Sequence, residues 1–175
     1  MTPDLLARAA KIRLACFDVD GTLTDGGLYY ADDGREMKRF DVQDGLGLRL
    51  LEDHGIAVAL ISARHGEVTV ARARDLRLSH VHGGVADKAA CLRGLRERLG
   101  LARDEVAHMG DDLPDLPALA EAGFAVAPAN AHARVAARVH WVTPARGGHG
   151  AARTLCDLIL QAQGHDDDAS AGPAR

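Results

Sequence analysis

Residues 12–24 read IRLACFDVDGTLT, and the fold class can be inferred from this segment. Its first part, residues 12–17, is a mostly apolar run of strand length that ends at two acidic residues, Asp18 and Asp20. Ligands of open α/β sheets bind outside the carboxyl ends of the strands. A buried strand that ends in two carboxylates therefore predicts a parallel sheet with a polar site at that edge.

The rest of the chain repeats this unit, because apolar runs of strand length alternate with stretches of helical period. Strands are predicted at 57–61, around 81, at 106–109, around 124–126 and at 139–142. Helices are predicted at 46–54 with Asp44 as the N-cap, at 67–76, from Asp87 to 99, around 116–120 and at 151–162. This alternation predicts an α/β fold, a three-layer sandwich with a parallel, Rossmann-like sheet.

A short hairpin is the one predicted element that does not follow this alternation of strands and helices. Residues 27–31 and 36–40 flank the turn-forming triplet Asp-Asp-Gly at 32–34, so we expect a hairpin flap over about residues 26–40. We expect residues 1–163 to form one domain and residues 164–175, with their Asp-rich run, to be a disordered tail.

Composition excludes several classes of function. The 175 residues are 47% hydrophobic and 26% charged, as in folded globular proteins. A formal net charge of −4 and few aromatic residues disfavour binding to nucleic acid or to an anionic membrane. No apolar run approaches the ~20 residues that span a bilayer, and we expect no signal peptide. Three cysteines without CxxC spacing favour a reducing compartment, so we expect a cytoplasmic protein.

Polar residues gather at the carboxyl ends of the predicted strands. They are Asp18 and Asp20 after the first strand, Ser62 after the second, Lys88 at the start of a helix, and Asp111, Asp112 and Asp115 after a later strand. Carboxylates at one edge repel each other unless a cation is present, and oxygen ligands beside a phosphate select Mg²⁺. Taken singly, each residue has an ordinary structural explanation, but the ordered set predicts a phosphate site with Mg²⁺.

In this order the residues resemble a known family. Residues 18–24 (DVDGTLT), Ser62, Lys88 and residues 110–115 (GDDLPD) resemble the motifs of the haloacid dehalogenase superfamily of phosphotransferases. More narrowly, segments between residues 10 and 164 are similar to the branch that hydrolyses 3-deoxy-D-manno-octulosonate 8-phosphate. The resemblance implies Mg²⁺-dependent hydrolysis of this phosphoric monoester through an aspartyl-phosphate intermediate, in lipopolysaccharide precursor synthesis.

The resemblance also implies a role for each residue. Asp18 would be the nucleophile, Asp20 the general acid and base, and Ser62 and Lys88 would bind the phosphoryl oxygens. The metal ligands would be Asp18, Asp111 and the backbone carbonyl of Asp20, with Asp112 and Asp115 tuning the surroundings of the ion. The implied substrate-binding residues are Asp20, Asp41, Val42, Gln43, Asp44, Gly45, Arg49, Arg64, Arg72 and Lys88.

Members of this superfamily often carry a cap domain, and this chain has no room for one. The insertion after the first motif is only the flap, and the stretch from Ser62 to Lys88 holds a helix and a strand. Selectivity must then come from the flap, nearby loops and another subunit. The resemblance implies a homotetramer whose sites are closed by neighbouring subunits, and we expect the flexible, cationic segment 146–150 (RGGHG) to take part.

Three alternatives stay open. A nine-carbon sialic-type acid 9-phosphate is a second candidate substrate, because the sequence does not separate acids of similar length. A signalling receiver domain also gathers acidic residues, Ser or Thr and Lys around a phospho-accepting Asp, but on a later strand than its acidic pair. A catalytically inactive regulatory module is disfavoured, because every chemical residue is present.

Overall fold

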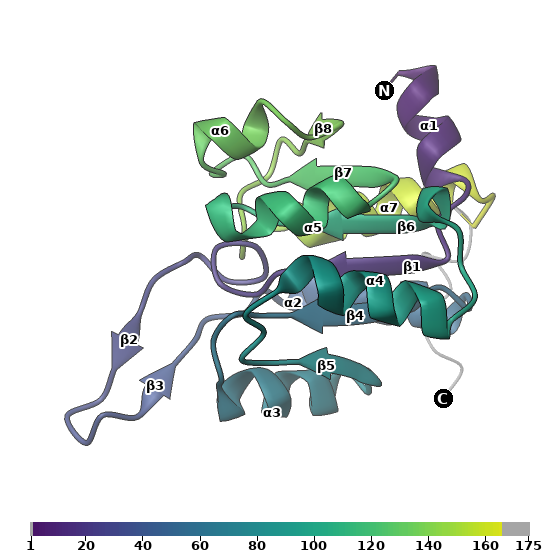
Figure 1. The fold of residues 1–175 in the computed structure, drawn as a ribbon. Coiled ribbons are helices and arrows are strands. Elements are labelled where there is room, and N and C mark those ends of the chain that lie inside the picture. The colour runs from purple at the N-terminus through teal and green to yellow at the C-terminus, as the bar shows by residue number, and fades with distance from the viewer. Residues whose placement is uncertain (1, 166–175) are drawn as a thin grey trace.

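A six-stranded sheet forms the centre of the computed structural model, which describes residues 2–165 (Figure 1). Its strands are β1 (Leu14–Phe17), β4 (Ala57–Ile61), β5 (His80–His82), β6 (Val106–Met109), β7 (Phe124–Ala127) and β8 (Trp141–Val142). Their order is β5-β4-β1-β6-β7-β8, and every neighbouring pair is parallel. The predicted parallel sheet is confirmed, and the strand that carries Asp18 lies between β4 and β6.

Helices cover both faces of the sheet (Figure 1). One face packs against α1 (Pro3–Ala9), α2 (Val42–Asp53), α3 (Glu67–Asp75) and α7 (Ala151–Ala162). The other face packs against α4 (Lys88–Arg98) and α5 (Leu116–Glu121). Successive residues of β1 alternate between these layers, since Ala15 and Phe17 belong to the first core and Leu14 and Cys16 to the second. The predicted three-layer sandwich is confirmed.

The remaining elements are short. Helix α6 (Ala133–Ala136) and two 3₁₀ turns, η1 (Arg103–Glu105) and η2 (Leu113–Asp115), lie in connecting segments. Neither α1 nor α6 was predicted, because helices of 7 and 4 residues show too little of the helical period to be recognised. Among the described residues, no helix is long and apolar enough to cross a membrane.

The flap is a two-stranded antiparallel hairpin formed by β2 (Tyr29–Tyr30) and β3 (Glu36–Met37). Both strands are shorter than the predicted arms, and a bridge between Thr24 and Phe40 closes the hairpin at its base. Figure 1 shows that it projects from the end of the sheet at which the central strands terminate. The acidic run of the predicted tail, 166–168, lies outside the described residues.

Helix α2 begins earlier than predicted. Its N-cap is Asp41, whose side chain accepts the backbone N–H of Gln43 at 2.7 Å. The prediction that Asp44 caps this helix was wrong, because Asp44 is buried and turned towards α7. There its carboxylate accepts the backbone N–H groups of Gly150 at 3.2 Å and Arg153 at 2.8 Å. Asp44 thus accepts hydrogen bonds from backbone N–H groups at the start of α7, which have no partner within that helix.

Candidate active site

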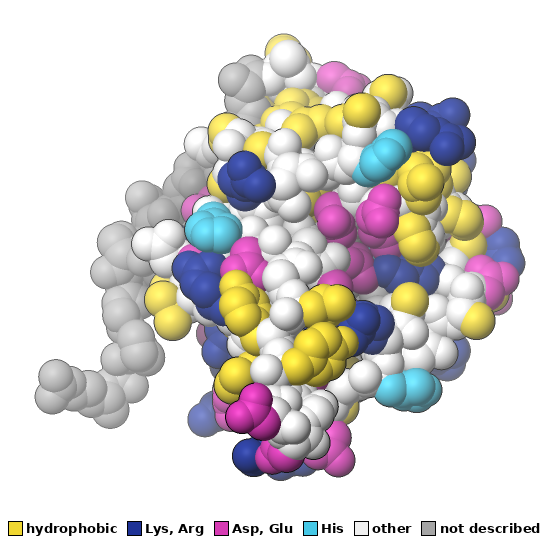
Figure 2. All heavy atoms as spheres, turned by 90° about the vertical axis from the view of Figure 1, so that its left-hand side faces the viewer, with side chains coloured by type: hydrophobic (Ala, Val, Ile, Leu, Met, Phe, Trp, Pro, Cys, Tyr) yellow, Lys and Arg dark blue, Asp and Glu magenta, His cyan; other side chains and the backbone are white. Residues whose placement is uncertain are grey.

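The carboxyl ends of the central strands meet at a cavity of about 230 Å³. Figure 2 looks onto this side of the molecule, where acidic side chains gather beside basic ones. The cavity is lined by Asp18, Asp20, Ser62, Ala63, Arg64, Lys88, Asp111, Asp112, Pro114 and Asp115. The structure therefore brings together all the predicted catalytic and metal-binding residues, together with Arg64.

Lys88 is the centre of the charge network in this cavity. Its Nζ donates to Oδ1 of Asp18 at 2.5 Å and to Oδ1 of Asp115 at 2.6 Å. The three side chains are at most 7% exposed. Asp87, the N-cap of α4, holds the start of the helix that carries Lys88. A buried ammonium between two carboxylates offsets the cost of removing all three from water.

Asp115 binds in two directions. Its Oδ1 accepts the hydrogen bond from Lys88, and its Oδ2 accepts the backbone N–H groups of Asp111 at 3.0 Å and Asp112 at 3.1 Å. This contact requires glycine at position 110, because a Cβ there would lie 2.5 Å from Cγ of Asp115. Asp115 therefore positions Lys88 and the acidic loop, and its oxygens are already engaged.

The remaining carboxylates fit a hard divalent cation. Oxygens of Asp18, Asp111 and Asp115 lie within 4.8 Å of one another. Asp111 accepts a hydrogen bond from the Thr22 hydroxyl at 3.3 Å, and it fits against Gly21, where a Cβ would lie 2.1 Å from its Oδ2. Because Asp115 is engaged by Lys88 and the loop, the side chains of Asp18 and Asp111 are the ones that fit Mg²⁺.

The cluster concentrates negative charge in a buried place. Burial raises the pKa of Asp18, the charge of Asp115 raises it further, and Lys88 opposes both effects. Burial raises the pKa of Asp111 to about 6, with Asp115 as the second cause. A divalent cation bound at this place stabilises the ionised forms of both carboxylates, so the electrostatics agree with the oxygen ligands.

Asp20 lies at the edge of the cavity and is bound by the flap. Its side chain is 24% exposed, and its Oδ1 accepts a hydrogen bond from Nζ of Lys38 at 2.6 Å. Lys38 follows β3, and its side chain is only 2% exposed. Lys38 was not predicted from the sequence as a site residue. The signal that could have found it is that the chain has only three lysines, Lys11, Lys38 and Lys88.

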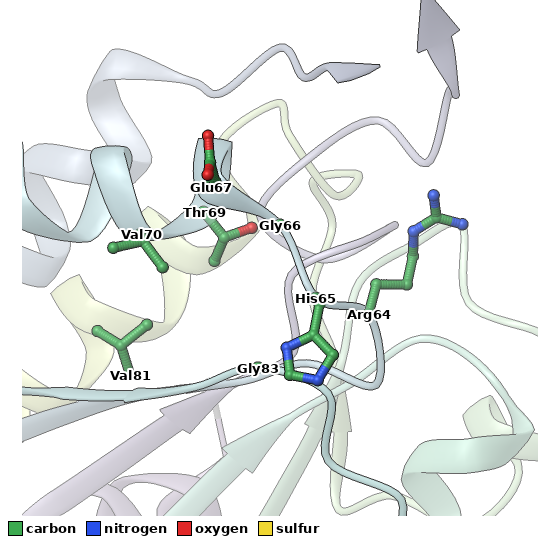
Figure 3. A pocket seen from close by; sticks show the side chains of 8 residues that line it. All are labelled: Arg64, His65, Gly66, Glu67, Thr69, Val70, Val81 and Gly83. Atoms are coloured by element: carbon green, nitrogen blue, oxygen red, sulfur yellow. The ribbon is translucent and has the colours of Figure 1, made fainter. Parts of the chain in front are cut away.

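Ser62 and Arg64 also line the cavity. Ser62 is buried at the end of β4, and its Oγ accepts the backbone N–H of Arg64 at 3.1 Å. The Arg64 guanidinium donates to Oε1 of Glu36 at 2.8 Å and to the hydroxyl of Tyr30 at 3.2 Å, both in the flap. Arg64 also borders a second pocket of about 510 Å³, which it forms with His65, the first turn of α3 and the β5 end (Figure 3).

Two predicted substrate arginines lie outside the catalytic cavity. Arg72 donates to the backbone carbonyl of Asp41 at 3.1 Å, and Gly45 makes room for it, since a Cβ there would lie 2.2 Å from the guanidinium. Arg49 donates to the backbone carbonyl of Leu76 at 3.1 Å and to Asp53. Both arginines hold α2 against α3 in this arrangement, and their role at the substrate stays a prediction.

The other predicted substrate residues form the first turn of α2. Val42 is 79% exposed and Gln43 is also exposed, so neither contacts the cavity from its own chain. Asp41 and Asp44 are used as the helix caps described above. Their contribution to substrate binding also stays a prediction.

The segment 146–150 differs from its prediction. Gly147 and Gly148 are buried against their own chain rather than free over the site. The Gly148 N–H donates to the carbonyl of Thr22 at 3.0 Å, and a Cβ at position 147 would lie 1.8 Å from the carbonyl oxygen of Gly21. These glycines therefore allow a close approach to the backbone of the DVDGT loop. The part of segment 146–150 in closing the site of a neighbouring subunit stays a prediction.

Comparisons with known proteins agree with this site. The family of haloacid dehalogenase-like hydrolases matches residues 54–155. The 3-deoxy-D-manno-octulosonate 8-phosphate phosphatase KdsC of Yersinia pestis is 42% identical, over 91% of this chain and 86% of that protein.

Two solved structures superpose closely. A hypothetical protein from Xanthomonas campestris is 56% identical with a TM-score of 0.95, over 98% of this chain and 93% of the other. A 3-deoxy-D-manno-octulosonate 8-phosphate phosphatase from Moraxella catarrhalis, in complex with a magnesium ion, a phosphate ion and a KDO molecule, is 41% identical with a TM-score of 0.94, over 98% of both chains. This chain therefore belongs to the haloacid dehalogenase-like hydrolases, in the branch whose named relatives are 3-deoxy-D-manno-octulosonate 8-phosphate phosphatases.

Proposed function

We propose that this protein hydrolyses 3-deoxy-D-manno-octulosonate 8-phosphate to the free sugar acid and orthophosphate, with Mg²⁺ bound. The observation that carries the proposal is the arrangement of Asp18, Lys88 and Asp111 in one cavity, with Asp20 at its edge. Relatives named for this reaction match nearly the whole chain, and one was solved with magnesium, phosphate and KDO. The product would then enter lipopolysaccharide assembly.

The first half of the reaction transfers the phosphoryl group to the protein. A carboxylate oxygen of Asp18 attacks phosphorus, the bond from phosphorus to the sugar oxygen breaks, and an aspartyl-phosphate forms on Asp18. Asp20 gives its proton to the departing sugar oxygen, which leaves as a hydroxyl group. Lys88 keeps the Asp18 carboxylate in place through the hydrogen bond to its Oδ1.

The second half restores the protein. Asp20, now ionised, takes a proton from water, the water oxygen attacks phosphorus, and the bond to Asp18 breaks to release orthophosphate. Ser62 and Lys88 donate hydrogen bonds to the phosphoryl oxygens. Mg²⁺, held by Asp18, Asp111 and the Asp20 carbonyl, supplies positive charge to those oxygens when bound.

The sugar acid needs more room than the catalytic cavity offers. A volume of about 230 Å³ lies below the ~300–1,000 Å³ that ligand pockets commonly have. Arg64 borders both this cavity and the neighbouring pocket of about 510 Å³ in Figure 3. We place the chain of the sugar acid along this path, with its carboxylate towards Arg64, because a guanidinium binds carboxylates in a bidentate manner.

We further propose a homotetramer in which neighbouring subunits close the sites. Large hydrophobic side chains of the flap and of α2 are 44–79% exposed, and they are Leu28, Tyr29, Tyr30, Met37, Val42 and Leu46. Hydrophobic side chains gathered on the face seen in Figure 2 are typical of an interface. Light scattering after size-exclusion chromatography should give the mass of four chains, and Met37→Glu should lower it together with sugar-phosphate turnover. A monomeric wild type with full turnover would refute this proposal.

We also propose that residues 1–163 form one domain of a cytoplasmic protein. All the strands of the central sheet contribute to one set of packed layers, which supports a single unit. The three cysteines are free thiols in the structure, as a reducing compartment requires.

A phosphate-release assay tests the proposed reaction. With Mg²⁺, the eight-carbon acid 8-phosphate should be hydrolysed with a higher kcat/KM than a nine-carbon sialic-type acid 9-phosphate, glucose 6-phosphate or 4-nitrophenyl phosphate. EDTA should abolish turnover and added Mg²⁺ should restore it. A higher kcat/KM for the nine-carbon acid 9-phosphate would make that compound the substrate in place of the eight-carbon acid 8-phosphate. If none of the four compounds releases phosphate, the proposed function is refuted.

A further inference from the structure

The arm by which the flap returns to the core has side chains of alternating burial. Met37 is 55% exposed and the Arg39 side chain 49% exposed, whereas the side chains of Glu36 and Lys38 are 15% and 2% exposed. Phe40 is partly buried against the main core. Successive side chains of an extended chain point to opposite sides, so the three inward residues share one face of the arm.

Each inward residue contacts a different side chain of the core, and two of these side chains, Arg64 and Asp20, line the catalytic cavity. Glu36 binds Arg64, two residues beyond Ser62, at 2.8 Å. Phe40 lies beneath the guanidinium of Arg72, which is 5.7 Å from the centre of its ring. Between them, Lys38 reaches Asp20 at 2.6 Å. The bridge at the base of the flap involves Phe40, so the backbone close to Lys38 is fixed to the core.

From this geometry we propose that Lys38 is a positioning residue for Asp20 in the reaction of the preceding section, on which this inference rests. The Lys38 ammonium holds Oδ1 of Asp20 and leaves Oδ2 for the proton that passes to the sugar oxygen and later comes from water. General acid–base catalysis needs the carboxylate within ~2.6–3.2 Å of that oxygen. A partly exposed Asp side chain samples several rotamers, and a buried charged partner selects one of them.

The two lysines with buried side chains thus act from different parts of the fold. Lys88, on a core helix, orients the nucleophile, and Lys38, on the flap, orients the acid and base. The flap of this capless protein therefore takes part in the chemistry as well as in substrate selection. A lysine that bound the substrate directly would instead change KM, whatever the leaving group.

The test replaces Lys38 by methionine, which keeps the length of the side chain and removes its charge. Lys11→Met is the matched control, because Lys11 is 58% exposed and pairs with Asp104 at the other end of the sheet. First-turnover product release is measured with the eight-carbon sugar acid 8-phosphate and with 4-nitrophenyl phosphate, whose leaving group needs no proton. We expect Lys38→Met to slow release of the sugar about 10- to 100-fold and release of nitrophenolate less than about threefold, with KM nearly unchanged.

A double variant separates this proposal from other roles. If Lys38 acts through Asp20, Lys38→Met should slow an Asp20→Asn protein less than about twofold, because the group it positions is already lost. The proposal would be overturned if Lys38→Met slowed the Asp20→Asn protein by as large a factor as it slows the wild type. It would also be overturned by an equal loss of rate on both substrates, or by a raised KM with unchanged kcat. Lys38→Arg keeps the charge and the hydrogen bond, and it should recover most of the sugar-phosphate rate.

Folding and substrate identity are controlled separately. Circular dichroism and thermal unfolding show whether Lys38→Met is folded, and if it is not, Lys38→Arg and the double variant carry the test. If the wild type releases phosphate from glucose 6-phosphate but not from the sugar acid phosphate, the proposed substrate is wrong. The comparison of leaving groups then uses glucose 6-phosphate, so Lys38 is still tested.

Discussion

The catalytic cavity and the first turns of α2 lie near the same edge of the sheet, yet they use charge differently. In the cavity, Asp18, Lys88 and Asp115 are buried and bound to one another, and their arrangement is complete within one chain. At α2, the guanidiniums of Arg49 and Arg72 are occupied by backbone carbonyls, and Val42 faces solvent. One chain therefore holds the residues proposed for phosphoryl transfer in a fixed arrangement, whereas the residues predicted to bind the sugar acid are less preorganised.

The physical reason is desolvation. Buried charges that lack water need fixed partners, so the cavity has one low-energy arrangement. Side chains at the half-exposed start of α2 exchange partners with water at little cost, so a ligand or a second subunit can redirect them. Substitutions in the catalytic cavity should therefore change activity more than substitutions at the start of α2.

The largest effect should come from the nucleophile. Asp18→Asn should lower kcat by about 10⁴-fold or more, because an amide does not form the aspartyl-phosphate. Phosphate release measures turnover, trapping of labelled phosphoenzyme measures the intermediate, and an unchanged circular dichroism spectrum shows that the fold is kept. A variant that retains a tenth of the wild-type rate would remove Asp18 from this role.

The next effect concerns proton transfer at the boundary between cavity and flap. Asp20→Asn should lower kcat about 10²- to 10⁴-fold with little change in KM, because general acid–base help is lost and substrate binding is not. Steady-state kinetics with the sugar acid phosphate measures both constants. An unaltered kcat would show that another group transfers the proton.

The free energy of unfolding should depend on pH through His108, a buried residue that interacts electrostatically with Asp115 and Lys88. His108, on β6, is fully buried, and burial is the main cause that lowers its pKa to about 4, with Asp115 raising it and Lys88 lowering it. Between about pH 6.5 and 4 the unfolded chain then binds a proton that the folded chain excludes, so stability falls as pH falls. Denaturant unfolding should show a loss of up to ~3 kcal/mol over this range from His108.

The variant His108→Phe isolates this contribution. The raised pKa values of Asp18 and Asp111 act in the opposite direction, since their folded forms bind protons more readily, and they are present in both proteins. The difference in unfolding free energy between wild type and variant should therefore shrink or reverse as pH falls from 7 to 4. A difference that is independent of pH would contradict the burial of a neutral His108.

The smallest effect should come from the arginine that holds α2 to α3. Arg49→Ala removes hydrogen bonds to Leu76 and Asp53, and it should lower the free energy of unfolding by ~1 kcal/mol. Turnover of 4-nitrophenyl phosphate should change less than about twofold. A large rise in KM for the sugar acid phosphate would move Arg49 into the substrate site, and the contrast between the two regions would then be weaker.

Much of the site could be predicted from the sequence, because its residues follow buried strands. Asp18, Ser62 and Asp111 come directly after, or within two residues of, the ends of β1, β4 and β6, and parallel strands bring those ends to one edge. Asp44 was misread because its partners, at the start of α7, lie more than 100 residues away. Lys38 was missed because its partner is known only when the flap is placed.

The parallel sheet, the order of the chemical residues and the lack of room for a cap domain between the motifs could all be predicted from the amino-acid sequence. Hydrophobic period and strand-end carboxylates are local, so the chain displays them directly. Which charged side chains meet became known from the folded arrangement: Lys88 pairs with Asp18 and Asp115, and Lys38 pairs with Asp20. The reason is that ion pairs join segments distant in sequence, and their geometry depends on how the layers and the flap pack.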